Sequence, residues 1–337
     1  MTPHLSPQSS RLVLWLKRLV MGGFAFLIVI ALAGAVFQRT ASLATERRFP
    51  VPGRLVDVGG HRLHINTRGK QGPSVVVEDG LMGASFYWDS IGDKIAAFTQ
   101  VTTYDRAGLG WSDPGPLPRT SQQIVSELHT LLQKAQVKPP YILVGYSMGG
   151  QHVRLYASKY PDEIAGLVLV DAANFDLVPK GKVNPPSPIL FDLLYWTAPL
   201  GIARLYVPFV LKDPTNNVEV LKFRREMQAT TKALRGAYHE IKGNSNWREV
   251  SSEIKNLGDK PVVVISHRID EGDTLGEAGK HNRSELERQK ALLDISRNSR
   301  SVVATSKLHT FPVYEPDPII NAIRELVETL RKDAPTH

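Results

Sequence analysis

Short apolar runs alternate with longer stretches of helical periodicity along most of the chain. Between residues 54 and 170 the apolar runs have the length of buried strands, and several are followed by segments whose apolar residues recur every three or four positions. This alternation is typical of a mostly parallel sheet that helices cover on both faces. The expected strands are 54–58, 62–67, 74–77, 101–104, 142–144, 166–170, 261–266 and 301–304, and the expected helices are 121–135, one that begins near Gly149, 284–295 and 318–331.

Two local signals support these assignments. Gly59 and Gly60 separate the first two strands, which predicts a hairpin with a tight turn. Thr120 or Ser121 can cap the start of the helix at 121–135.

Residues 173–257 have a different character. Proline is frequent from 179 to 199, helical stretches follow, and no parallel-strand signal occurs. We interpret this region as a helical insertion over the carboxyl edge of the sheet. Its apolar and aromatic residues indicate either an apolar substrate group beneath it or the insertion's own core, and they are Phe191, Leu193, Tyr195, Trp196, Tyr206 and Phe209.

An uncharged apolar segment spans residues 19–37, long enough to cross a bilayer as a helix. Two interpretations stay open. A signal anchor with a cytoplasmic N-terminus is the first, and a cleaved signal peptide is the second, since Ala31, Ala33 and Ala35 resemble a cleavage region. A buried core helix does not suit a segment that is apolar on every face.

Composition narrows the class of protein. The chain has 337 residues, 42% apolar and 22% charged, as in ordinary globular proteins. It has no cysteine, which excludes disulfides, cysteine nucleophiles and thiolate metal sites. The net charge of +8 comes from dispersed Lys and Arg residues, so we expect no nucleic-acid partner.

The stretch 141–151, YILVGYSMGGQ, carries the main chemical signal. An apolar run stops at Gly145, Ser147 follows at the centre of G-Y-S-M-G, and a helix begins near Gly149. A serine at a sharp turn between strand and helix is the arrangement called the nucleophile elbow. We therefore predict Ser147 as a nucleophile.

A serine nucleophile needs a base, and the base needs an orienting carboxylate. His309 lies in the loop after the last expected strand, where the base belongs in the order Ser, acid, His. Two positions suit the acid equally: Asp171, which ends the strand after the elbow helix, and Asp270, which follows the strand at 261–266. His267 and His152 are expected to be structural or surface residues.

Backbone amides must meet the oxyanion that forms during acyl transfer. We expect one from Met148, directly after the nucleophile, and one from Leu81 in the glycine-bearing loop after the strand at 74–77. The chain contains no P-loop motif, no H-E-x-x-H and no convincing metal-ligand spacing, so we expect neither a metal nor a cofactor.

Four motifs together resemble the α/β-hydrolase superfamily of esterases and lipases: VVVEDGLMGAS, YDRAGLGWSDPG, YILVGYSMGGQHVRLYASKYPDEIAGLVLVD and LHTFPVYEPD. The resemblance covers residues 53–334, and the segment 51–60 behind the apolar segment is similar to a membrane-anchored bacterial subgroup. Two positions depart from the common pattern, because Asp79 replaces a His before the oxyanion glycine and Tyr146 replaces a His before the nucleophile. Within the subgroup, the strand that ends in Asp171 matches well and the region of Asp270 matches poorly.

The resemblance implies an α/β-hydrolase fold, with a mostly parallel sheet, flanking helices, a helical cap and one N-terminal transmembrane helix. We expect a cytoplasmic tail at 1–18, a transmembrane signal anchor at 19–37, a linker at 38–52, the first part of the hydrolase core at 53–172, the cap at 173–257 and the second part of the core at 258–334. The expected protein is a single-pass membrane serine hydrolase with an extracytoplasmic domain that cleaves a small, partly apolar, ester-like substrate. The alternatives are a non-catalytic scaffold that binds a ligand or partner, and a cofactor-free perhydrolase or haloperoxidase.

Overall fold

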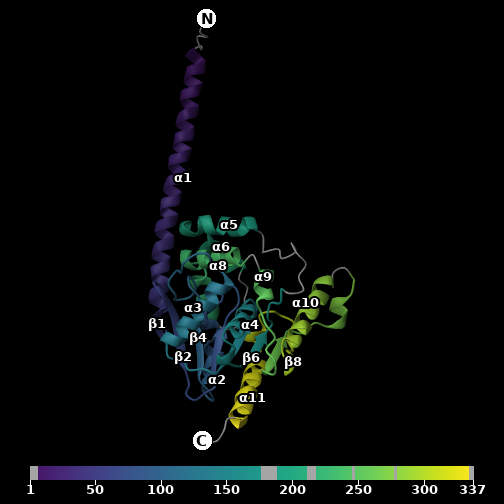
Figure 1. The fold of residues 1–337 in the computed structure, drawn as a ribbon. Helices are drawn as coiled ribbons and strands as arrows, with labels where there is room; N and C mark the ends of the chain where they lie inside the picture. Colours follow the sequence, from purple (N-terminus) through teal and green to yellow (C-terminus); the bar gives the residue numbers. More distant parts are fainter. Residues whose placement is uncertain (1–6, 176–187, 211–217, 245–246, 277–278, 334–337) are drawn as a thin grey trace.

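The structure, a computed structural model, describes residues 7–175, 188–210, 218–244, 247–276 and 279–333. Within these residues eight strands form one sheet, in the order β1-β2-β4-β3-β5-β6-β7-β8. Figure 1 shows the twisted sheet at the centre of the domain, beside one long helix. The strands are β1 (Arg54–Asp57), β2 (Arg62–Arg68), β3 (Ser74–Glu78), β4 (Val101–Tyr104), β5 (Tyr141–Tyr146), β6 (Ile164–Val170), β7 (Val262–Ser266) and β8 (Ser299–Val303).

The sheet is antiparallel at one edge and parallel elsewhere. β1 and β2 form the expected hairpin, β2 pairs antiparallel with β4, and every pairing from β4 to β8 is parallel. Gly59 and Gly60 have φ values of +121° and +92°, which is why glycine suits the turn. The parallel strands end at one edge, so the loops after β3, β5, β6 and β8 can meet there.

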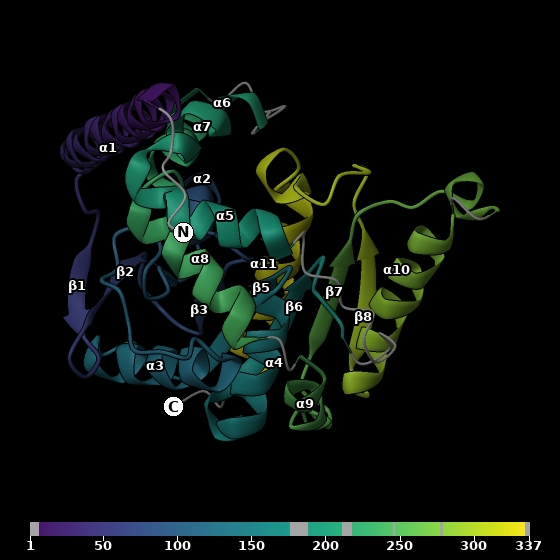
Figure 2. The same ribbon diagram turned by 90° about the horizontal axis from the view of Figure 1, so that it is seen from above.

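Helices cover both faces of the sheet, as Figure 2 shows from above. On one face lie α3 (Ser121–Lys134) and α4 (Gly149–Lys159), and on the other α2 (Asp89–Ala96) and α11 (Asp317–Asp333). Side chains alternate across each strand, so Leu143 of β5 enters the first core while Ile142 and Val144 enter the second. Each such buried side chain stabilises the fold by roughly 1.5–3 kcal/mol.

The expected helices agree with the structure except at their ends and in one omission. Thr120 caps α3, because its side chain accepts a hydrogen bond from the Gln123 N–H. The helix expected at 284–295 is α10 (Lys280–Ala291), followed by a short 3-10 turn. Helix α2 was not predicted, because it is short and contains Gly92, which packs against the Arg68 side chain.

The described residues of the segment 173–257 form helices and connecting turns and include no strand. The segment contributes α5 (Pro188–Thr197), a 3-10 turn at Ala198–Leu200, α6 (Ile202–Val210), α7 (Val218–Met227), α8 (Thr231–Gly243) and α9 (Trp247–Ser252). Figure 1 shows α5, α6 and α8 stacked over the sheet, and we call this segment the cap. The prolines between 179 and 187 and the side chain of Phe209 lie outside the described residues.

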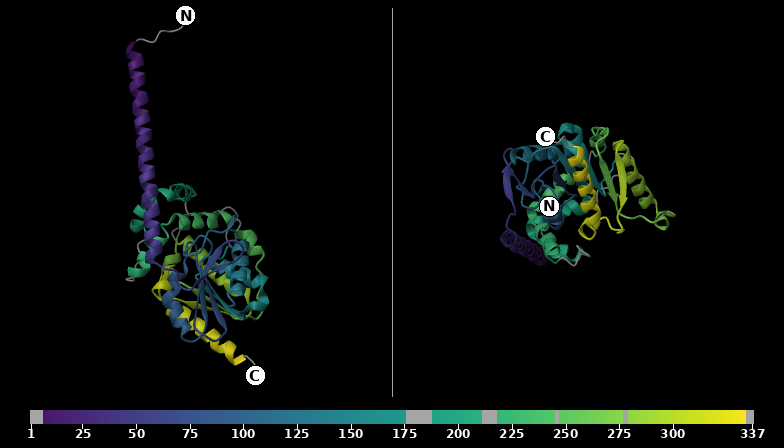
Figure 3. Two further views of the ribbon diagram at one scale, coloured as in Figure 1. Left: turned by 90° about the vertical axis from the view of Figure 1, so that its left-hand side faces the viewer. Right: turned by 90° about the horizontal axis from the view of Figure 1, so that it is seen from below.

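One helix, α1 (Pro7–Arg48), contains the whole apolar segment and extends beyond it at both ends. It is long and apolar enough to cross a membrane, and none of its most apolar window is buried against the domain, unlike a core helix. Figure 3 shows it projecting far from the domain. The part expected to be a linker is helical to Arg48, because it lacks glycine and proline up to Pro50.

The end of α1 packs against the cap. Gln38 is buried, and its side-chain amide donates to the Ala229 carbonyl at 2.9 Å. Thr45 is also buried, and Arg48 forms an ion pair with Glu226 of α7. Residues 38–49 are therefore part of the packing of the domain.

Candidate active site

Ser147 lies at a sharp turn between β5 and α4. Its φ is +52°, a left-handed conformation that is uncommon for a residue with a side chain. Two backbone hydrogen bonds hold the turn: the Ser147 N–H donates to the Val170 carbonyl at 3.0 Å, and the Ala173 N–H donates to the Ser147 carbonyl at 2.7 Å. This support offsets the strain and leaves the side chain at the carboxyl edge of the sheet.

The two glycines of the G-x-S-x-G pattern lie where neighbouring backbone segments leave no room for a side chain. A Cβ at Gly149 would lie 2.2 Å from the Glu78 carbonyl oxygen, and one at Gly145 would lie 2.7 Å from the Gly150 Cα. Any larger residue at either position would push strand and helix apart. The pattern therefore has a steric cause.

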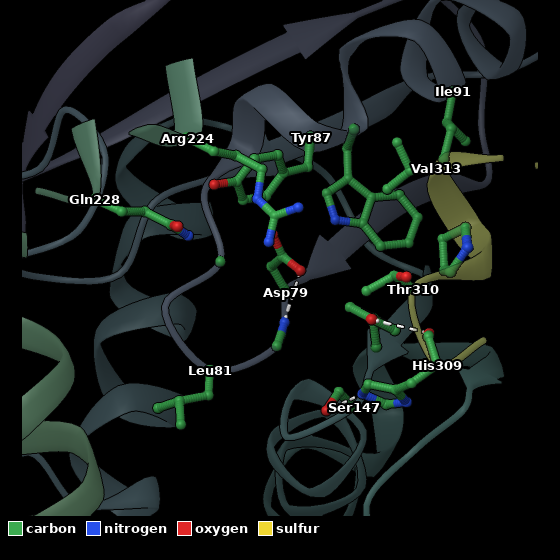
Figure 4. A pocket seen from close by; sticks show the side chains of 15 residues that line it. Asp79, Leu81, Tyr87, Ile91, Ser147, Arg224, Gln228, His309, Thr310 and Val313 are labelled. Carbon is green, nitrogen blue, oxygen red and sulfur yellow. Dashed lines mark hydrogen bonds between the residues drawn. The ribbon is translucent and has the colours of Figure 1, made fainter. Parts of the chain in front are cut away.

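His309 reaches Ser147 from the loop after β8. Its Nε2 lies 3.0 Å from the Ser147 Oγ, and its Nδ1 lies 2.6 Å from the Asp171 Oδ2. Figure 4 shows the hydrogen bond between Ser147 and His309 at the wall of a cavity. Three residues from separate segments are thus joined in one chain of hydrogen bonds.

Asp171 directly follows β6 and is buried. Its φ is +43°, and its carboxylate contacts two imidazoles, since His267 Nδ1 also lies 2.7 Å from Oδ2. Burial raises the pKa of Asp171, but the hydrogen bonds from His267 and His309 outweigh burial and lower it below the ordinary value. The same contact with Asp171 raises the pKa of His267.

Asp270 makes different contacts. Its carboxylate forms ion pairs with Lys307 at 2.6 Å and Arg268 at 3.1 Å, and it caps a short 3-10 turn with Asp273. Its side chain is 45% exposed. Among the described residues, the carboxylate that the fold brings to His309 is Asp171.

A cavity of about 320 Å³ lies beside Ser147. Figure 4 shows Asp79 at its centre, Ser147 and His309 on one wall, and on the other Arg224 of the cap helix α7 and Gln228, which directly follows that helix. The lining is mostly apolar or aromatic near Ser147 and polar near α7. The cavity is lined by Asp79, Gly80, Leu81, Gly83, Tyr87, Trp88, Ile91, Tyr146, Ser147, Arg224, Gln228, His309, Thr310, Pro312 and Val313.

Residues 73–199 match the sequence profile of the α/β hydrolase fold. A probable hydrolytic enzyme from Pseudomonas aeruginosa superposes on 82% of this chain and 95% of its own, with a TM-score of 0.64 and 16% identity. The profile match and the superposition together show that the chain has the α/β-hydrolase fold. The strand order and the position of Ser147 are thereby explained as features of one fold.

Curated relatives match only parts of this chain. The chain is 29% identical over 63% of its length to the probable transporter efuK of Hormonema carpetanum and 36% identical over 36% of its length to YqjL of Bacillus subtilis, and it spans 30% and 51% of those proteins. The human (lyso)-N-acylphosphatidylethanolamine lipase is 29% identical over 40% of this chain and 42% of its own length. The chain thus spans about half or less of each of these three relatives.

The side chain of Asp79 fills the inside of the loop after β3. This residue occupies a position where the superfamily's common pattern has His. The Asp79 Oδ1 accepts the Gly80 N–H at 2.7 Å, and a Cβ at Gly83 would lie 2.2 Å from the Asp79 Cγ. Gly80 packs on Ser147, since a Cβ there would lie 3.1 Å from the Ser147 Cβ. Leu81 lines the cavity with Ser147, and Met148 follows Ser147 in the turn.

Arg106, which sequence analysis did not single out, clamps this loop. Its guanidinium donates to the carbonyls of Asp79 at 2.7 Å and Gly80 at 2.6 Å. It also pairs with Glu78 at 2.9 Å and with Glu240 of the cap helix α8 at 2.7 Å. The side chain is fully enclosed, so these bonds tie the loop to the sheet and the cap. Its place in the motif YDRAGLGWSDPG was the available signal.

Tyr146, the second departure, supports His309. Its hydroxyl donates to the His309 carbonyl at 3.0 Å, and its ring stacks on the imidazole with centroids 5.2 Å apart. His152 is structural as expected, because it is buried and its Nδ1 lies 2.8 Å from Glu78. His267, by contrast, belongs to the site, and its position directly after β7 was the signal for it.

Asp171, His267 and His309 also present potential ligand atoms within 4.8 Å of one another, a spacing that suits a metal ion. Both imidazoles direct Nδ1 at the same carboxylate, and N–H···O bonds account for that arrangement. The expectation that the protein needs no metal stays a prediction.

Because the Asp79 carboxyl is buried, we expect the free energy of unfolding to depend on pH. Burial raises the pKa of Asp79 to about 6, against the Gly80 N–H and Arg106, which lower it. The folded protein therefore binds the proton more tightly than the unfolded chain, and stability falls as pH rises from the unfolded pKa toward 6. We expect Asp79→Asn to raise the unfolding free energy by about 1–3 kcal/mol at pH 8.

Thermal unfolding of both proteins at pH 5 and pH 8 checks this expectation. The stabilisation should be smaller at pH 5, where the native carboxyl is largely protonated. If Asp79→Asn stabilised the protein equally at pH 5 and pH 8, ionisation of the buried Asp79 carboxyl would not be the cause.

Proposed function

We propose that the protein is a serine hydrolase that cleaves an ester-like bond through an acyl-enzyme. The observation that carries this proposal is the continuous hydrogen-bond chain from Ser147 Oγ through His309 to Asp171, with distances of 3.0 and 2.6 Å. The match of residues 73–199 to the profile of the α/β hydrolase fold supports hydrolysis as the reaction class.

In the proposed reaction His309 Nε2 takes the proton of Ser147 as the oxygen attacks the carbonyl carbon. Asp171 holds Nδ1–H of His309 and stabilises the imidazolium that forms. The amides of Met148 and Leu81 receive the negative charge of the tetrahedral oxyanion. His309 then protonates the leaving alcohol, and water repeats the sequence to release the acid and restore Ser147.

The cavity supports a substrate with one apolar group. Near Ser147 the walls are aromatic or aliphatic, with Trp88, Ile91 and Val313 among them, while Arg224 and Gln228 form a polar end. A volume of about 320 Å³ is small for a binding site, which favours short or medium acyl groups. The human lipase relative acts on lipids, which is consistent with an apolar acyl group.

We also propose that α1 anchors the chain in the membrane as a single-pass signal anchor, with the domain on the extracytoplasmic side. The helix has the required length and composition. Arg11, Lys17 and Arg18 precede the apolar segment and favour a cytoplasmic N-terminus.

A fluorophosphonate probe tests the proposed function. The full-length protein in detergent should be labelled, and mass spectrometry should place the adduct on Ser147. A series of p-nitrophenyl esters should then show turnover that falls once the acyl chain outgrows the cavity. An unlabelled protein, or an adduct on another serine, would count against the proposal.

His267 is expected to act as a positioning residue through Asp171. In His267→Ala the carboxylate loses a hydrogen bond that lowers its pKa, so Asp171 should become more basic. A more basic partner stabilises the His309 imidazolium, so the acid limb of the kcat/KM profile should move to higher pH. We expect kcat to fall by no more than about tenfold, since the pair of His309 and Ser147 is retained.

The pH profile distinguishes this role from a structural one. His281→Ala, on α10, is the matched control and should leave the profile unchanged. A His267→Ala profile that superposes on that of the wild type would show that His267 does not act on the carboxylate.

A further inference from the structure

The outer surface of the cap carries an apolar patch next to α1. It consists of Ile189, Leu193 and Trp196 on α5 and Ile202, Leu205 and Tyr206 on α6, and each of these side chains is exposed. The three residues on α5 are separated by four and then three positions, and those on α6 by three and then one. Each set therefore lies along one face of its helix. We call these six residues the cap patch.

Polar residues of the same helices bond to the rest of the protein. On α5, Asp192 accepts a hydrogen bond from the Tyr238 hydroxyl at 2.9 Å and pairs with Lys242, both on α8. On α6, Arg204 donates to the Gln38 side chain of α1 at 2.9 Å. Arg204 lies opposite Ile202 and Tyr206 on α6, whereas Asp192 borders the cap patch on α5 and is 44% exposed. The six residues of the cap patch themselves are exposed and apolar or aromatic.

The contact between cap and α1 sets the level of the patch. A Cβ at Gly34 would lie 2.6 Å from the Leu200 carbonyl, and one at Gly201 would lie 2.9 Å from the Phe37 ring. Leu200 and Gly201 join α5 to α6. With a helical rise of 1.5 Å per residue, Gly34 lies about 4.5 Å inside the apolar end of the span at Phe37.

We propose that the cap patch is inserted into the surface of the bilayer that α1 spans. A depth of about 5 Å is in the range for helices that lie in a membrane interface, where Trp and Tyr are enriched. Figure 1 shows α5 and α6 beside α1 at the level where it leaves the domain, with α11 at the far end. This inference rests on the membrane anchoring that is part of the proposed function.

The same arrangement links the bilayer to the active site. Helix α7 contacts α1 through the Glu226 ion pair with Arg48 and lines the cavity with Arg224, and Gln228, directly after α7, lines the cavity as well. The cap therefore lies between the lipid surface and Ser147. The substrate class that fits this arrangement is an ester that partitions into the membrane and enters beneath the cap.

The cysteine-free chain permits a direct test by single-cysteine labelling. The full-length protein is reconstituted in phosphatidylcholine and phosphatidylglycerol vesicles, with or without brominated acyl chains, and carries a nitrobenzoxadiazole fluorophore at Leu193→Cys or Leu205→Cys. Phe26→Cys and Val36→Cys on α1 calibrate depth, and Glu328→Cys on α11 is the control in water. We expect quenching at Leu193 and Leu205 similar to that at Val36, and none at Glu328.

The other possible quenching results contradict either the inserted cap patch or the membrane anchor. Quenching at Phe26 and Val36 without quenching at Leu193 and Leu205 overturns the inserted patch and leaves the anchor intact. No quenching at Phe26 overturns both. Blue-shifted emission at Leu193 that bromine does not quench, and that dilution of the protein abolishes, assigns the patch to a second copy of the chain instead.

A kinetic comparison in the same vesicles reports on substrate delivery. The double variant Leu193→Ser, Leu205→Ser should raise KM for a membrane-partitioned ester and leave kcat/KM for a water-soluble ester unchanged. An equal loss on both esters would overturn delivery through the cap. Turnover of neither ester by the wild type would contradict the hydrolase proposal alone, since the quenching result does not depend on catalysis.

Discussion

Replacing Ser147 by alanine is expected to lower kcat by about 10⁶-fold, because the variant lacks the oxygen that forms the acyl-enzyme. Ester turnover by full-length protein in detergent measures the loss. Binding and the oxyanion amides remain, so a residual rate of about 10³-fold over the uncatalysed reaction is expected. Fluorophosphonate labelling should disappear completely.

Ser126→Ala is the matched control, since Ser126 lies exposed on α3 and does not line the cavity. It should keep wild-type turnover and labelling. The alanine at 147 also removes the contact with His309 Nε2, so thermal unfolding should accompany the assay to show that the fold is retained. A Ser147→Ala protein with near wild-type turnover would refute acyl-enzyme formation at this residue.

The second large effect separates the two candidate acids. Asp171→Asn should lower kcat by about 10⁴-fold, because an amide at this position no longer stabilises the imidazolium and favours the wrong tautomer of His309. Asp270→Asn should leave kcat within about twofold of the wild type, since Asp270 pairs with Lys307 and Arg268 at the surface, where such pairs contribute about 0–1 kcal/mol.

Comparing the two variants identifies the acid more clearly than measuring either variant alone. Both changes are isosteric and remove one negative charge, so a general electrostatic effect would lower both rates alike. A large loss in Asp270→Asn with little loss in Asp171→Asn would mean that the loop after β7 rearranges to bring Asp270 to His309. The pH profile of Asp171→Asn should also shift, because the group that holds His309 Nδ1 is changed.

The fold class was predictable because its signals are local. Each signal extends over only a few residues. The apolar runs of strand length form strands, the periodic stretch at 121–135 forms a helix, and the glycines around Ser147 flank the turn. The same locality explains the omission of α2, since a short helix that contains Gly92 has little periodicity to detect.

The features around α1 were only partly predictable. The apolar segment at 19–37 is evident in the sequence, but the continuation of α1 along the cap depends on contacts such as Gln38 with Ala229, nearly two hundred positions away. For the same reason, the outward orientation of Leu193 and Trp196 was not apparent. Composition alone does not distinguish cap core from exposed surface.

The sequence by itself determined the α/β architecture, the turn that presents Ser147, and the loop that holds His309, because short-range sterics and hydrophobic period control these features. Only the tertiary structure decided between Asp171 and Asp270 as the neighbour of His309, and only it joined His267, Tyr146 and Arg106 to the site. The physical reason is that these contacts join side chains from separate strands and loops. Their distances depend on how the whole sheet and cap pack, which spacing along the chain does not encode.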